Sequence, residues 1–146
     1  MKDFLRNGKL LTLMLGHLSV DSYVGVLPVF YPLLIGRFHL NLATVGLVSL
    51  AYGGTAAVSQ PIFGMIADRF GTRLTGVALG WTALTFSLAG FVPSFPLPLA
   101  LACASGIGSC AFHPLAALGV RALLPERRRS WGLVVYVPAG MAGVAT

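Results

Sequence analysis

Three ionisable side chains, His17, Asp21 and His113, stand isolated within long apolar stretches of the sequence. His17 and Asp21 are four positions apart, so a helix would place them on one face and within reach of each other. A carboxylate beside a histidine can gain and lose a proton near neutral pH. The sequence therefore predicts a proton-coupling or substrate-sensing site at Asp21, with His17 and His113 as its companions.

A structural role is the alternative for these three residues. His17 and Asp21 could form a buried pair, and His113, which directly precedes Pro114, could bond a backbone carbonyl. The functional interpretation is favoured for Asp21, because carboxylates inside a membrane are rarely retained without a role. For His113 both interpretations stay open. No cofactor and no metal ion are expected.

The composition places these groups in a membrane protein. The 146 residues are 56% apolar and 10% charged, whereas soluble domains are about 45–50% apolar and about 25% charged. This excludes a soluble enzyme, a disordered tail and a nucleic-acid-binding domain, despite the net charge of +6. The apolar runs do not alternate as barrel strands do, so we expect an all-α integral membrane protein.

The charges divide the chain into segments that can each cross a bilayer, which takes about 20 apolar residues. The predicted spans are approximately 10–35, 45–67, 74–92, 97–119 and a truncated fifth at 131–146. Pro93 to Pro96 predict a turn between the third and fourth spans. The fifth span is short for a crossing, so we expect four transmembrane helices plus an incomplete fifth, from a fragment of a longer protein.

The basic residues indicate how the chain is oriented. The ten are Lys2, Arg6, Lys9, Arg37, Arg69, Arg73, Arg121, Arg127, Arg128 and Arg129. All except Arg37 lie in the N-terminal segment or in the loops after the second and fourth spans. The positive-inside rule therefore predicts a multi-pass protein of the cell (inner) membrane with a cytoplasmic N-terminus. A cleaved signal peptide is not expected, because no small-x-small site precedes Asp21.

The loop after the second span carries the most specific motif, Gly64-Met-Ile-Ala-Asp68-Arg69-Phe-Gly71-Thr-Arg73. A tight reversal there needs a positive φ, which Gly71 can adopt. The decapeptide resembles the signature loop of the major facilitator superfamily, G-x-x-x-D-R-x-G-R-K, except that Thr72 replaces a basic residue. The resemblance implies gating: this loop would lock the two halves of a transporter in one state and would not bind substrate.

The resemblance also implies a fold. Members of that family have twelve helices in two halves built from inverted repeats, so this chain would be the N-terminal part of such a fold. The first and fourth helices line the family's central cavity, and these are the spans that hold Asp21 and His113. Further segments, 16–21, 27–34 and 106–114, are similar to the fosmidomycin-resistance branch, whose members export small molecules, including an antibiotic, from bacteria.

The resemblance implies that this chain is part of a secondary active transporter. That transporter would be a proton-coupled antiporter that exports a small organic compound or drug. Its partners would be the lipid bilayer, the substrate, protons and the missing C-terminal part, without nucleic acid. An uptake permease for a small metabolite, a non-transporting membrane fragment and a small oligomeric channel stay open. An intramembrane enzyme is disfavoured, because Cys103 replaces the first glycine of a G-x-S-G motif around Ser105.

Overall fold

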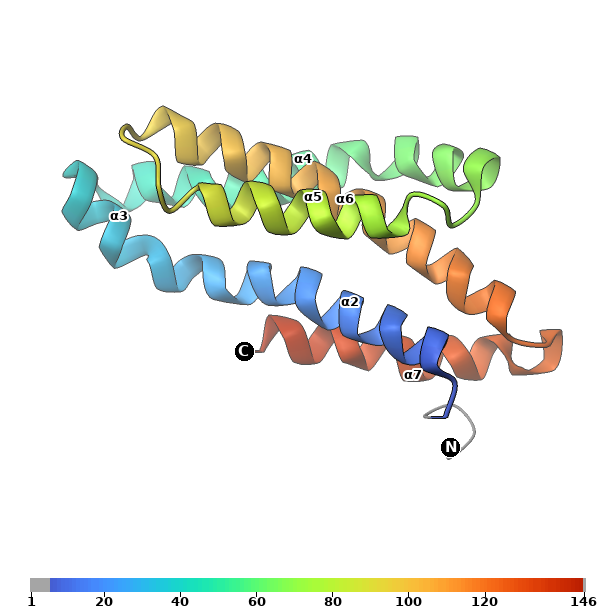
Figure 1. The fold of residues 1–146 in the computed structure, drawn as a ribbon. Helices are drawn as coiled ribbons and strands as arrows, with labels where there is room; N and C mark the ends of the chain where they lie inside the picture. The colour runs from blue at the N-terminus through green and yellow to red at the C-terminus, as the bar shows by residue number, and fades with distance from the viewer. Residues whose placement is uncertain (1–5, 146) are drawn as a thin grey trace.

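The computed structural model describes residues 6–145, so Lys2 and Thr146 of the sequence-based predictions lie outside it. Within the described residues every regular element is a helix (Figure 1). In chain order the elements are α2 (Gly8–Val26), the 3-10 turn η1 (Leu27–Phe30), α3 (Tyr31–Phe38), α4 (Leu42–Phe70), α5 (Thr75–Leu88), α6 (Pro96–Leu123), the 3-10 turn η2 (Glu126–Arg128) and α7 (Arg129–Val144).

Three helical segments are long and apolar enough to cross a membrane: Gly8–Phe38, Leu42–Phe70 and Pro96–Leu123. The expected span 74–92 contains α5, which has 14 residues and is therefore only about 21 Å long. Beyond Leu88 the backbone tightens into 3-10-type bonds before Pro93, since the N–H of Gly90 donates to the carbonyl of Ser87. The last helix, α7, has 16 residues.

Local sequence explains where the helices begin and bend. The side chains of Asn7 and Asn41 cap α2 and α4 by accepting bonds from backbone N–H groups three residues on. Pro28 lacks an N–H group, and the first helix passes through η1 at this point before continuing as α3. At the other end of α4, Gly71 has φ +64°, which confirms the expected positive φ at the reversal.

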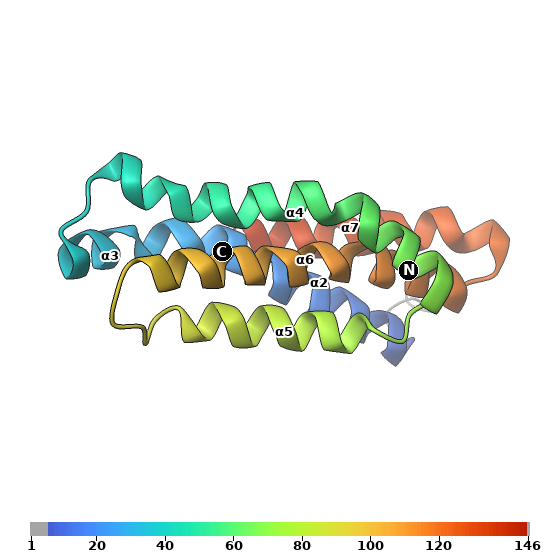
Figure 2. The ribbon, with the colours of Figure 1, turned by 90° about the horizontal axis from the view of Figure 1, so that it is seen from above.

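The helices pack in two groups that meet along α6 (Figures 1 and 2). The helices α4 and α5 pack along α6, and α7 packs along α2, which in turn contacts α6. Small residues of α6 allow the neighbouring helices to approach it closely. A Cβ added to Gly106 would strike the Tyr52 carbonyl of α4, and one added to Gly108 would strike Thr82 of α5.

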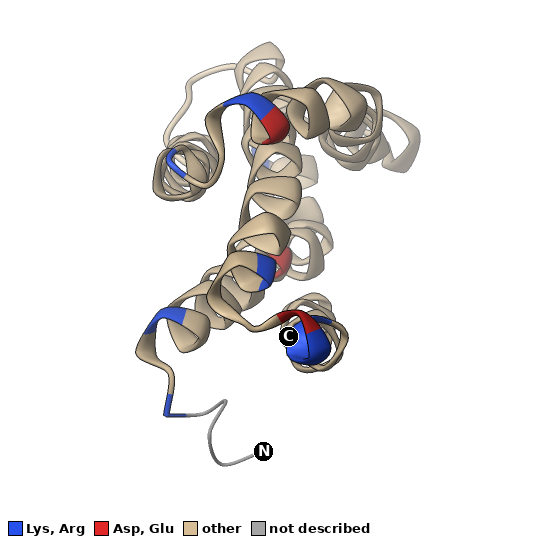
Figure 3. Cartoon of the chain, turned by 90° about the vertical axis from the view of Figure 1, so that its right-hand side faces the viewer, with Lys and Arg blue, Asp and Glu red and all other residues tan. Residues whose placement is uncertain are grey.

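Charged and apolar side chains are separated along the length of the bundle. The start of α2, the α4–α5 loop and the α6–α7 connection lie at one end, which carries most of the Lys and Arg residues (Figure 3). Arg37, near the end of α3, lies at the opposite end. Large apolar side chains such as Val58, Phe91 and Val134 are exposed along the sides, as expected where lipid replaces water.

Candidate functional site

The three ionisable residues of the apolar segments meet in space. His17 Nε2 lies 3.3 Å from Asp21 Oδ2, which confirms that the two residues of α2 are within reach of each other. His113 Nε2 of α6 lies 3.4 Å from Asp21 Oδ1. The Asp21 carboxylate therefore sits between two imidazoles that come from different helices. We refer to His17, Asp21 and His113 as the Asp21 cluster.

The helix α7 supplies a third side of the Asp21 cluster. His17 Nδ1 lies 3.1 Å from the backbone carbonyl of Tyr136, in a buried contact. The Tyr136 ring stacks on the His17 ring, with centroids 4.2 Å apart and planes 15° apart. Stacking and hydrogen bonding together fix the plane of the imidazole and the direction of its second nitrogen.

Gly140 is the reason that α7 can approach so closely. A Cβ added at this position would meet Asp21 Oδ2 and would lie 2.6 Å from His17 Cε1. Any larger residue would therefore have to push the carboxylate or the imidazole away. One turn further on, a Cβ at Gly143 would strike the Leu18 carbonyl of α2. The two glycines therefore allow the α7 backbone to lie directly against α2 at the site.

The hydrogen-bond pattern defines which nitrogen of His17 carries a proton. A carbonyl oxygen can only accept, so Nδ1–H of His17 must be the donor to Tyr136. In the neutral imidazole Nε2 then has only a lone pair, and it faces a carboxylate oxygen that is also an acceptor. Two acceptors at 3.3 Å are favourable only with a proton on one of them or a cation between them. The cluster is built to hold at least one cation or proton.

Burial strengthens this requirement. The side chains of His17 and Asp21 are 10% and 15% exposed, whereas that of His113 is 32% exposed. An uncompensated carboxylate in such surroundings is costly. The greater exposure of His113 makes it the member of the cluster that a solute can contact.

The atom types of the cluster also suit a divalent metal ion. Two imidazole nitrogens and one carboxylate oxygen lie within 4.8 Å of one another, and zinc sites use these same ligand types. A catalytic or transport metal would need water or substrate at a fourth position.

Two tyrosines that sequence analysis did not single out join the site. Tyr136 is buried, and among the described residues no group makes a hydrogen bond to its phenol. Tyr52 of α4 is also buried, and its phenol likewise has no hydrogen-bond partner among the described residues. A buried phenol without a partner is uncommon in native proteins. In the sequence, the only indication of a role for these two residues is that each is a tyrosine within an apolar span.

The proposed gating residues lie at the C-terminal end of α4 and in the loop after it, at the basic end of the bundle. Asp68, Arg69 and Arg73 are all exposed, and within residues 6–145 no ion pair involves Asp68. The Arg69 guanidinium lies 5.6 Å from the Phe70 ring. Gly64 lies within α4, with open space where a Cβ would stand. The loop thus presents its charges outward and not to one another.

Comparison with known proteins agrees with this architecture. Residues 13–146 match the family model of the Major Facilitator Superfamily. The chain therefore belongs to this family of transmembrane transporters and is embedded in a membrane.

A relative from Bacillus subtilis (strain 168), described as "Uncharacterized MFS-type transporter YfnC", is 28% identical over 131 residues. That alignment covers 88% of this chain and 32% of the relative, so the chain spans about a third of the relative's length.

Proposed function

We propose that this chain is the N-terminal part of a secondary active transporter that couples proton movement to the transport of a small organic compound through the Asp21 cluster. The observation that carries the proposal is the Asp21 carboxylate between His17 Nε2 and His113 Nε2, at 3.3 and 3.4 Å. A proton between these groups compensates the buried carboxylate, and its release leaves a charge that favours a different arrangement of α2 and α6.

The groups around Asp21 support proton coupling over a purely structural pair. They are His17 on the same helix, His113 on α6 and Tyr136 on α7, whose ring stacks on that of His17. A structural pair needs one histidine, whereas this carboxylate has two, and one of them is partly exposed. Because the site links three helices, a change in its charge acts on their packing.

The substrate would bind beside the cluster. The Tyr136 phenol lacks a partner among the described residues, and His113 is the most exposed member of the cluster. Both suit a compound that carries a hydrogen-bonding group on an otherwise apolar body. In transporters of this family the site lies between two halves, so the rest of the lining would come from the C-terminal part of the protein.

The segment Gly64–Arg73, which forms the end of α4 and the loop after it, would act as the gate. Asp68 and the two arginines have no ion pair with one another, which leaves them available to a partner segment on the other half of the transporter. The basic end would face the cytoplasm, in an inner membrane, because eight of the nine Lys and Arg residues that the structure describes lie there.

We propose efflux by proton antiport as the direction of transport. It rests on the similarity of residues 16–21, 27–34 and 106–114 to the fosmidomycin-resistance branch, whose members export small molecules, including an antibiotic. Uptake of a small metabolite would use the same cluster with the gradients reversed. The sign of substrate movement in vesicles with an imposed proton gradient distinguishes the two.

The decisive experiment compares Asp21→Asn with Asp68→Asn in the complete transporter, reconstituted in liposomes. The asparagine at 21 keeps the shape of the side chain but cannot exchange a proton, so we expect proton-driven transport to fall to background at every pH. Asp68→Asn should slow transport but preserve its dependence on the proton gradient. Undiminished proton-driven transport by Asp21→Asn would refute the proposal.

A further inference from the structure

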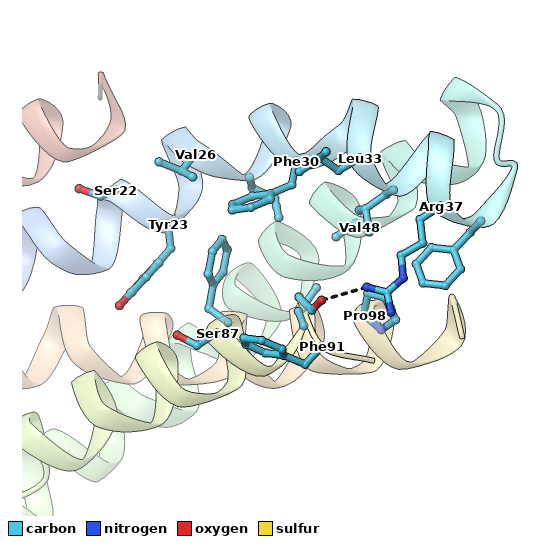
Figure 4. A pocket seen from close by; sticks show the side chains of 17 residues that line it. Ser22, Tyr23, Val26, Phe30, Leu33, Arg37, Val48, Ser87, Phe91 and Pro98 are labelled. Atoms are coloured by element: carbon cyan, nitrogen blue, oxygen red, sulfur yellow. Dashed lines mark hydrogen bonds between the residues drawn. The ribbon is translucent and has the colours of Figure 1, made fainter. Parts of the chain in front are cut away.

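A cavity lies at the opposite end of the bundle from the basic loops. It has a volume of about 750 Å³ and is enclosed by the α2–η1–α3 segment, α5 and α6, with Val48 of α4 (Figure 4). Aromatic rings line much of it, including Tyr23, Phe30, Phe86 and Phe91. We refer to it as the Arg37 pocket, because Arg37 is the one charged side chain in its lining.

The Arg37 pocket is elongated along the bundle. Its lining on the first helical segment runs from Ser22 to Phe38, which at 1.5 Å per residue corresponds to roughly 24 Å. One leaflet of the hydrocarbon core is about 15 Å deep. The lining on this segment is therefore longer than one leaflet is deep, which suits an extended acyl chain.

Arg37 is held at the mouth of this pocket. Its guanidinium Nη1 donates to the Gly90 carbonyl at 3.1 Å, drawn as a dashed line in Figure 4. The guanidinium Cζ lies 5.3 Å from the centroid of the Phe38 ring. No carboxylate among the described residues pairs with it. A guanidinium has five N–H donors, so most of them remain available to an anion.

We propose that the Arg37 pocket binds one membrane phospholipid, with an acyl chain among the aromatic rings and the phosphate on Arg37. Arginine is suited to phosphate, because its planar group donates two parallel hydrogen bonds. A polar solute would need several convergent polar groups to fix its orientation. The lining has only Tyr23 and Ser87 as further hydroxyl groups, because Ser22 is already bonded to the Leu18 carbonyl. A single cation above a long apolar slot matches the layout of a lipid.

The site differs from the Asp21 cluster in position and in chemistry. The lipid would lie between α3 and α5, whereas the cluster lies between α2, α6 and α7. A bound acyl chain would join α3 to α5 in a region where these two elements share few direct contacts. Lipid binding at this pocket is therefore independent of proton coupling at the Asp21 cluster.

Native mass spectrometry of the purified chain in detergent, titrated with dioleoylphosphatidylglycerol, tests this assignment. We expect one retained lipid per chain and about tenfold weaker retention for Arg37→Gln, because a charge-assisted phosphate contact is lost. Ser87→Trp, which places an indole in the cavity, should abolish retention while the helical circular dichroism is unchanged. Lys9→Gln removes an exposed charge at the other end and should have no effect.

Two further ligands identify the group that Arg37 recognises. Dioleoylglycerol, which lacks the phosphate, should bind wild type about as weakly as the phospholipid binds Arg37→Gln. Equal losses in Arg37→Gln and Lys9→Gln, or full retention in Ser87→Trp, would overturn the proposal. Saturable binding of 1-naphthalenesulfonate without any retained lipid would also overturn it, since the pocket would then take a soluble anion.

Discussion

The carboxylate of Asp21 on α2 lies 3.4 Å from His113 Nε2 on α6, so one partly buried acidic group joins two helices that are far apart in the sequence. The other carboxylate oxygen faces His17, whose ring is held by the Tyr136 carbonyl of α7. A change in the charge of this carboxylate therefore alters contacts among three helices, α2, α6 and α7. Such a link is what a coupling site requires.

Replacing His113 by glutamine should impair proton-driven transport while leaving the fold intact. Glutamine can still hydrogen-bond Asp21 but cannot carry the positive charge, and hydrogen bonds to charged groups contribute about 1.5–3 kcal/mol. We expect the transport rate at a fixed proton gradient to fall about tenfold or more. His39→Gln is the matched control, because His39 is exposed at the end of α3. Equal rates for both variants would contradict a role for His113.

Gly140→Ala should destabilise the protein because the new methyl group has no space. It would meet Asp21 Oδ2 and the His17 ring, and overpacking of this kind costs about 1–3 kcal/mol. We expect a lower midpoint of thermal unfolding in detergent. Gly80→Ala in α5 is the control, because nothing lies within 4 Å of its added Cβ, and alanine is favoured over glycine within a helix. A midpoint for Gly140→Ala at or above that of Gly80→Ala would contradict the close approach of α7.

Gly71→Ala should destabilise the turn that ends α4. The φ of +64° there is unfavourable for a residue with a Cβ, at a cost of about 1–2 kcal/mol. We expect a measurable fall in thermal stability, together with faster proteolysis at the α4–α5 loop. Gly46→Ala within the same helix has open space around its Cβ and should be neutral or stabilising. Indistinguishable proteolysis of the two variants would show that the turn tolerates a side chain.

Removing divalent metals should not affect transport. We assign the cation of the Asp21 cluster to a proton, although its three ligand-type atoms lie within 4.8 Å of one another. Transport measured after treatment with a chelator should therefore equal that of the untreated transporter, with added magnesium as the control for chelator toxicity. Loss of transport that zinc restores would replace the proton by a metal ion.

The helical character of this chain is a local property, and the sequence was sufficient to predict it. Long apolar runs can satisfy their backbone in lipid only as helices, and α4 and α6 lie where such runs occur. The i, i+4 contact of His17 with Asp21 and the positive φ of Gly71 also follow from a few neighbouring residues. The end of α5 at Leu88 was harder to predict, because apolar residues continue through its last turns.

The composition of the functional site depends on how the helices cross, and only the tertiary structure decided it. No periodicity in the sequence brings His113 to Asp21 or directs the Tyr136 carbonyl to His17, because these contacts require specific distances between helices. Gly140 resembles any small residue of a packed helix until the approach of α7 is known. Arg37 likewise reads only as a charge outside the membrane until the cavity beside it is seen. Sequence thus determined which segments are helical and apolar enough to cross a membrane, since that is a matter of composition, whereas packing determined which polar atoms meet.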